Sequence, residues 1–157
     1  MRKRIISSPA AKAASGQHPS LDIARLAVAE LSSEDPEHPI EAAIDALSGD
    51  GWRAAEDGPQ TIRLVFDEPV FIHRIYLVFR EAAIMRQQEF VLSYRSAGHR
   101  QLREFVRQQY NFSPPDTVEE VEDYQVQQSD VVELQLDIVP DTSKRPARAS
   151  LARLRLS

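Results

Sequence analysis

Apolar and polar residues alternate along most of this chain, in short runs that turn-forming residues separate. The alternation is clearest at residues 62–67, 74–80 and 132–138. A period of two is typical of a strand that buries one face. Further runs of this kind occur at residues 90–94, 102–112, 124–127 and 149–156. Many short strands at near-even spacing predict an all-β chain, an antiparallel β-sandwich of about eight strands.

One short helical turn is expected among these strands, at residues 40–47. Pro39 suits the position before it, because proline is tolerated at the start of a helix. Gly49, Asp50 and Gly51 end the turn. Residues 21–31 are ambiguous by pattern alone, since their apolar positions suit both a helix and a strand.

The first twenty residues differ from the rest of the chain. Residues 7–20 are small, polar and interrupted by prolines, which predicts a flexible N-terminal arm at 1–20 and one domain at 21–157. Residues 1–9 begin with basic side chains, but only Ile5 and Ile6 follow where a signal peptide needs about 7–15 apolar residues. No run approaches the roughly 18 apolar residues of a membrane span. We therefore expect a cytoplasmic protein.

Composition narrows the classes of function. The 157 residues, 42% of them hydrophobic, suffice for one core. The net charge of -5 argues against a nucleic-acid partner, because binding to phosphates depends on lysine and arginine. Without cysteine, the chain has no disulfide, thiolate zinc site or cysteine nucleophile.

The sequence contains no motif of a known catalytic machinery. It has neither a GxSxG elbow nor an HExxH helix, and its five glycines are scattered. The four histidines are separated from one another without the spacing of metal ligands. These observations indicate a binding protein rather than an enzyme.

Five stretches, in their order along the chain, resemble the discoidin domain, also called the coagulation-factor C-type domain. They are residues 27–36, 43–45 before Trp52, 60–66, 94–98 and 152–156. The resemblance implies a galactose-binding-like jelly roll and a strand at residues 23–31. Asp45-Ala46 replaces the usual Asp-Gly, and the cysteines of secreted members are missing, so the chain is more similar to a stand-alone bacterial relative.

Trp52 and two segments rich in arginine and glutamine are the candidate ligand contacts. An indole on a loop either stacks on a sugar ring or plugs the end of the core. Residues 85–89 and 107–113 combine a guanidinium with planar amides, which suit hydroxyl groups. In a strand, one exposed face of the second segment would carry Arg107, Gln109 and Asn111, and the other, core-facing one would carry Gln108, Tyr110 and Phe112. The predicted ligand-binding residues are Trp52, Arg86, Gln88, Arg107, Gln109 and Asn111.

For the two arginine segments there is a structural alternative. Arg86 and Arg107 instead pair with nearby carboxylates such as Glu89 and Glu104, and so hold two loops together.

Acidic side chains give two further candidates. Asp45, Ser48 and Asp50 suit the oxygen cage of calcium, and the resemblance implies a structural calcium at this loop; alternatively, Asp45 and Asp50 cap the turn. Residues 119–123 form an acidic run that we expect to be a solvated loop. This run and the basic residues 144–148 are patches of opposite sign that could join subunits into an oligomer.

Two functions remain open from the sequence. The first is a non-catalytic module that recognises a carbohydrate or a similar hydroxylated ligand through its end loops. The second is a protein-interaction or assembly module without a small-molecule ligand.

Overall fold

The structure is a computed structural model that describes residues 18–45 and 50–157. The described part contains eight strands and two four-residue helices. They are α2 (Ile23–Leu26), β1 (Ala27–Leu31), α3 (Glu41–Ile44), β2 (Trp52–Asp57), β3 (Gln60–Arg80), β4 (Arg86–Ser96), β5 (Arg103–Phe112), β6 (Glu119–Val139), β7 (Arg148–Leu151) and β8 (Arg153–Leu156). The predicted all-β architecture is confirmed. Across these residues, no helix is long and apolar enough to cross a membrane.

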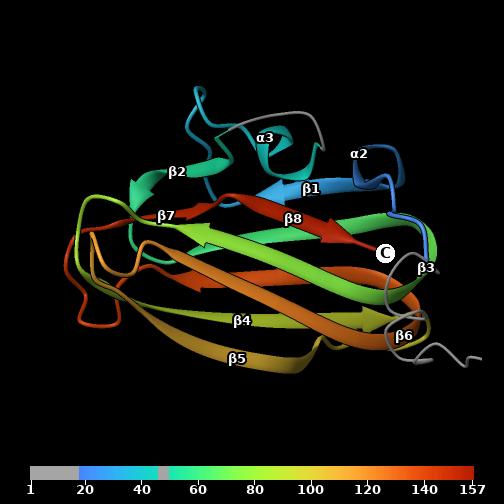
Figure 1. Cartoon of the computed structure of the whole chain (residues 1–157). Helices are drawn as coiled ribbons and strands as arrows, with labels where there is room; N and C mark the ends of the chain where they lie inside the picture. The colour runs from blue at the N-terminus through green and yellow to red at the C-terminus, as the bar shows by residue number, and fades with distance from the viewer. Residues whose placement is uncertain (1–17, 46–49) are drawn as a thin grey trace, which may run out of the picture.

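Two long strands, β3 and β6, organise the fold and run through both of its layers (Figure 1). The first half of β3 pairs with β1 and with the second half of β6, which continues to β4 and β5. The second half of β3 pairs with β8 and with the first half of β6. Register shifts between Val65 and Arg74 mark the change of partners. Because each half has different neighbours, the sheet folds over into a sandwich.

The core follows the alternation of the sequence. Phe79 of β3 and Phe90 of β4 stack with their ring centroids 5.1 Å apart, which joins the two layers. Nearly all of the alternating residues predicted to face inward in the three clearest runs are buried: Ile62, Leu64, Phe66, Ile75, Leu77, Phe79, Leu134, Leu136 and Ile138. The exception is Val132, which is half-buried, while its neighbour Val131 is buried.

Several predicted strand boundaries differ from the structure. The runs at 62–67 and 74–80 belong to one strand, β3, and those at 124–127 and 132–138 to β6, whereas the run at 149–156 is divided into β7 and β8. Trp52, expected on a loop, begins β2.

Two further segments differ in kind. Residues 23–31 were expected as one strand, but residues 23–26 form α2, because the Asp22 carbonyl and carboxylate accept hydrogen bonds from the first turn. Only Ala27–Leu31 pairs with β3. The acidic run at 119–123 was expected as a loop and instead begins β6, where Glu119 and Asp123 form ion pairs with arginines of β3.

The other predicted boundaries are only partly described. The helical turn expected at 40–47 corresponds to α3, and residues 46–49 lie outside the described residues. Of the predicted arm, only residues 18–20 are described, and the His18 ring stacks on His73 at 3.5 Å. The arm at 1–17 stays a prediction.

Candidate functional site

A cavity of about 280 Å³ lies where β2, β7 and the end of β3 meet. Seven of its eleven lining residues are polar or charged, and the lining comes from four separate parts of the sequence. The lining residues are His38, Asp50, Trp52, Arg53, Arg80, Glu81, Ala82, Ala83, Arg148, Ser150 and Ala152. We call this cavity the arginine pocket.

Strand pairing gathers three arginines around Ser150. Arg53 lies directly opposite Ser150 in the β2–β7 pair, so their side chains share one face. Arg148 is two residues before Ser150 on β7 and therefore points to the same side. The Ser150 hydroxyl donates to the backbone carbonyl of Arg80 at 3.4 Å, which brings the end of β3 to the same place.

These guanidinium groups keep most of their hydrogen-bond donors available. Arg80 donates through Nε to Glu119 at 2.9 Å, which leaves its two terminal nitrogens. Arg148 approaches Asp35 only to 4.0 Å. The Arg53 side chain has no hydrogen bond or ion pair within residues 18–45 and 50–157. The pocket therefore offers donors to an acceptor-rich ligand.

Trp52 borders this pocket but is enclosed. Its side chain is among the largest fully buried ones, with a residue exposure of 1%. The indole Nε1 donates to the backbone carbonyl of Ser33 at 3.2 Å, which satisfies its polar atom. Of the two interpretations from sequence, the geometry favours the core plug, because little of the ring reaches the cavity.

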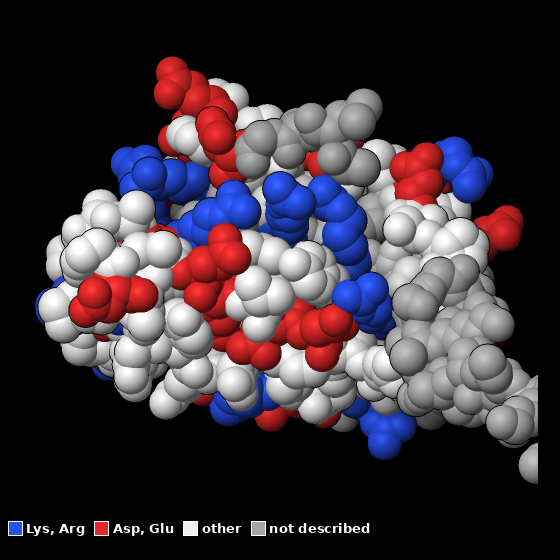
Figure 2. Space-filling model, viewed as in Figure 1, with Lys and Arg blue, Asp and Glu red and all other residues white. Residues whose placement is uncertain are grey.

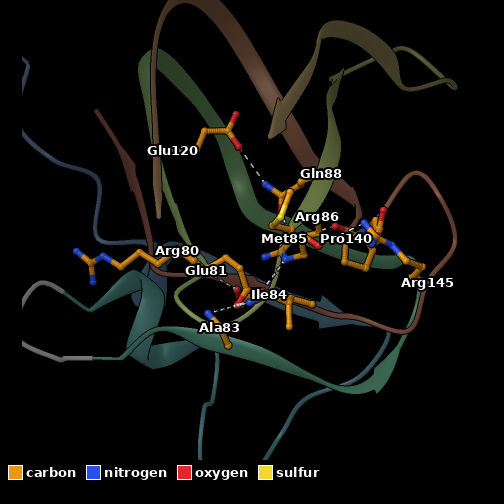
Figure 3. A network of polar contacts seen from close by, with 12 residues as sticks. Arg80, Glu81, Ala83, Ile84, Met85, Arg86, Gln88, Glu120, Pro140 and Arg145 are labelled. Atoms are coloured by element: carbon orange, nitrogen blue, oxygen red, sulfur yellow. Dashed lines mark hydrogen bonds and ion pairs between the residues drawn. The ribbon is translucent and has the colours of Figure 1, made fainter. Parts of the chain in front are cut away.

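The loop between β3 and β4 forms one wall and is shaped by Glu81 (Figure 3). The Glu81 carboxylate accepts hydrogen bonds from Arg86 Nε at 2.7 Å and from the backbone N–H groups of Ala83 and Ile84 at 3.0 and 3.3 Å. Burial alone would raise the pKa of Glu81, but the hydrogen bonds from Arg86 and the loop lower it on balance. A charged Glu81 thus fixes the loop.

Arg86 and Gln88 were predicted to meet a ligand, but they lie in β4 with side chains that face the interior. Arg86 donates to the Pro140 carbonyl at 2.9 Å and to Gln88 at 3.1 Å, and its guanidinium lies 4.7 Å from the Phe112 ring centroid. Gln88 donates to Glu120 at 3.1 Å. Neither residue lines the cavity. Arg86 holds Glu81 of the pocket wall, and Gln88 accepts a hydrogen bond from Arg86.

The alternation predicted for the second segment holds in β5. Arg107, Gln109 and Asn111 are exposed on one face, while Phe112 is buried and Tyr110 half-buried; Gln108 is exposed, unlike its expected position. Arg107 donates to Glu89 at 2.9 Å and Glu104 at 2.8 Å, as in the structural alternative. The three exposed residues do not line the arginine pocket, and their ligand role stays a prediction.

The described residues fit a calcium cage poorly. The Arg155 guanidinium donates to the carbonyl oxygens of Ala43 at 2.8 Å and Asp45 at 3.1 Å, so a cation already occupies this side of the loop. Within residues 18–45 and 50–157, no three His, Cys, Asp or Glu side chains gather as metal ligands. Residue 48 lies outside the described part. Calcium binding by Asp45 and Asp50 stays a prediction.

Of the residues that line this pocket, the sequence predicted only two as binding residues: Trp52, as a ligand contact, and Asp50, as a calcium ligand. His38, Arg53, Arg80, Arg148 and Ser150 come from segments far apart in sequence, and none of them belongs to a motif. The only local signal is that Arg80 and Arg148 stand at strand ends, where side chains reach the rim of a sandwich.

No known family profile and no curated protein sequence matches the chain. Solved structures match its fold. CpGH89CBM32-5 from Clostridium perfringens, in complex with GalNAc-beta-1,3-galactose, is 18% identical and aligns over 88% of this chain and 99% of its own, with a TM-score of 0.64. The family 32 module of NanJ from C. perfringens, in complex with galactose, is 14% identical. It aligns over 87% of this chain and 96% of its own, with a TM-score of 0.60.

A third match has a different kind of partner. XRCC1, solved bound to the catalytic domain of DNA polymerase beta, is 18% identical over 88% of this chain and 98% of its own, with a TM-score of 0.60. At such low identity these structures show the fold alone. The chain shares the jelly-roll fold of these structures, as the resemblance to the discoidin domain implied.

Proposed function

We propose that this chain is a non-catalytic module that binds a carbohydrate or a similar hydroxylated ligand in the arginine pocket. The observation that carries the proposal is the pocket itself, in which guanidinium, imidazole, hydroxyl and carboxylate groups surround about 280 Å³. Such a mixture of donors and acceptors suits the hydroxyl groups of one sugar ring. The fold supports this proposal, because structures that share it hold GalNAc-beta-1,3-galactose and galactose.

The pocket is also built to keep its shape. Arg53 and Ser150 belong to paired strands, and the loop wall is held by the Glu81–Arg86 ion pair. Rigid placement reduces the entropy that a binding site loses when a ligand enters. A preformed pocket on strands therefore favours ligand binding over a role as a mobile linker.

The test is a glycan array followed by calorimetry on the sugars that bind. We expect Arg80→Ala to weaken binding by about tenfold or more, as the loss of a charged hydrogen bond implies. Arg103→Ala is the matched control, because Arg103 is an exposed arginine of β5 outside the pocket. A folded chain that binds no saccharide, or two variants of equal affinity, would contradict the proposal.

An interaction module is the second candidate. Apolar side chains are exposed beside the pocket wall: Ile84, Met85, Val118 and Val121 are 42%, 64%, 38% and 49% exposed. Glu81 N–H donates to the Val118 carbonyl at 2.9 Å, so residues 84–85 and 118 lie at the same end of the sandwich. Apolar residues gathered on a surface are typical of protein contacts. Light scattering would reveal self-association, and a strict monomer without a partner would count against this function.

A further inference from the structure

The arginine pocket differs from a neutral sugar site in the charge of its lining. Three guanidinium groups line it, together with the carboxylates of Asp50 and Glu81. Glu81 is already engaged by Arg86 and two backbone N–H groups. The cations facing the cavity therefore outnumber the carboxylates that remain available to a ligand.

The charged residues of the pocket follow the β2–β7 strand pair. Arg148 stands at the start of β7, and Arg53 lies opposite Ser150, two residues further along. Asp50 precedes Gly51, whose backbone packs against Leu151 at the end of β7 and against Ala152. Asp50 is thus near the end of β7 that is opposite to Arg148, and we call the Arg148 end of the pocket its basic end.

The surrounding surface strengthens the basic end. Figure 2 shows Lys and Arg side chains in a band that extends from the region of β2 and β7 across β8 and the adjacent part of β3. Strand register places Arg74, Arg80, Arg153 and Arg155 on this face. On the neighbouring strand β6, Glu119 and Asp123 pair with Arg80 and Arg74. The local potential at the pocket is thus more positive than the chain's net charge of -5 suggests.

We propose that the pocket selects a saccharide that carries a carboxylate, such as a hexuronic acid residue. This inference rests on the carbohydrate-binding function proposed above. A carboxylate is planar and accepts two parallel hydrogen bonds from a guanidinium, a geometry that Arg53, Arg80 and Arg148 offer. His38 and Asp50 remain for the ring hydroxyls, since an imidazole and a carboxylate both accept hydrogen bonds.

The experiment compares galacturonate, its methyl ester and galactose by calorimetry on the full chain. The ester keeps the ring and removes the charge, so it isolates the carboxylate. We expect galacturonate to bind about tenfold or more tightly than the ester, because a charge-assisted hydrogen bond is replaced by a neutral one. The preference is expected to shrink between low salt and about 0.5 M salt, as screening weakens it.

Two pocket variants and one control complete the test. Arg148→Gln and Arg53→Gln are expected to bring the acid-to-ester affinity ratio close to one, while Arg103→Gln, with the same change of charge, keeps it. A ratio near one in the unmodified chain, or a ratio unchanged in both pocket variants, overturns the inference and leaves carbohydrate binding intact. If the folded chain binds none of these sugars and no saccharide on a glycan array, the proposed function itself fails.

Discussion

Glu120 is a carboxylic acid enclosed between the two layers, with 1% of its surface exposed. Gln88 donates to one of its oxygens at 3.1 Å, and the other oxygen has no hydrogen-bond partner among the described residues. Burial, followed by the nearby Glu122 carboxylate, raises the pKa of Glu120 from 4.5 to about 8. At neutral pH this side chain is therefore held in its uncharged form.

This shift gives the first prediction, a pH dependence of stability. Between pH 4.5 and about 8 the folded chain holds the Glu120 proton and the unfolded chain has released it. The folded state is therefore favoured at lower pH, and this contribution is lost as the pH rises through 8. Glu120→Gln keeps the shape without the charge. We expect it to raise the melting temperature at pH 9 by about 2–4 °C, the effect of about 1 kcal/mol in a chain of this size.

The comparison needs the same measurement at pH 5, where the difference between Glu120→Gln and the unmodified chain should nearly vanish. Glu37→Gln is the matched control, because it removes one carboxylate from an exposed position. A melting temperature of Glu120→Gln that is unchanged or lower at pH 9 would show that folding does not raise the pKa of Glu120.

At the scale of elements, Arg155 of β8 stabilises the end of α3. Its guanidinium donates to the carbonyl oxygens of Ala43, Asp45 and Leu154 at 2.8, 3.1 and 3.0 Å. The last carbonyls of a helix lack partners within it, and a cation near them is favourable. Arg155 thereby attaches the helix to the last strand, at the loop where the resemblance implied calcium.

The second prediction concerns this contact. We expect Arg155→Gln to lower the free energy of unfolding by about 2 kcal/mol, because charged hydrogen bonds are lost. Arg153→Gln is the control, since Arg153 is an exposed neighbour on the same strand without such bonds. We also expect neither calcium nor a chelator to change the melting temperature of the unmodified chain. A rise with calcium that Asp45→Asn abolishes would establish the metal site instead.

At the scale of the whole molecule, the two long strands couple the layers. β3 and β6 contribute one half to each layer, so neither layer can lose its strands without disturbing the other. The small β2–β7 sheet carries Trp52, which is buried in the same core cluster as residues of both layers.

This arrangement predicts a single cooperative unfolding transition. The fluorescence of Trp52, the only tryptophan, reports on the β2–β7 end, and far-ultraviolet circular dichroism reports on all strands. We expect both signals to change at the same temperature, as a two-state transition requires. An earlier fluorescence transition would mean that the β2–β7 end, and with it the arginine pocket, unfolds separately.

The fold was largely predictable because its information is local. Alternating residues such as Ile62, Leu64 and Phe66 must share one face of a strand, whatever lies next to them. The predictions failed where local rules competed. The pattern of residues 23–26 suits a helix capped by Asp22 as well as it suits a strand. The acidic run at 119–123 forms a strand because arginines of the neighbouring strand pair with it, and the run's own sequence does not show these partners.

The candidate site was predicted less well. Arg86 and Gln88 have side chains that suit a hydroxylated ligand, but the alternation along β4 points both of them into the interior. Arg53, Arg80 and Arg148 have the same chemistry and face a cavity. Whether a guanidinium meets a ligand or the core depends on which face of its strand packs inward, and a single residue type cannot determine this.

By itself, therefore, the sequence determined that this chain forms an antiparallel sandwich, because side-chain alternation, turns and proline positions act over a few residues. Only the tertiary structure decided which polar side chains surround a cavity. Two long-range contacts bring residues between 38 and 152 around one cavity. They are the pairing of β2 with β7 and the contact of the end of β3 with Ser150 of β7. Such contacts depend on long-range register, which no short stretch of sequence encodes.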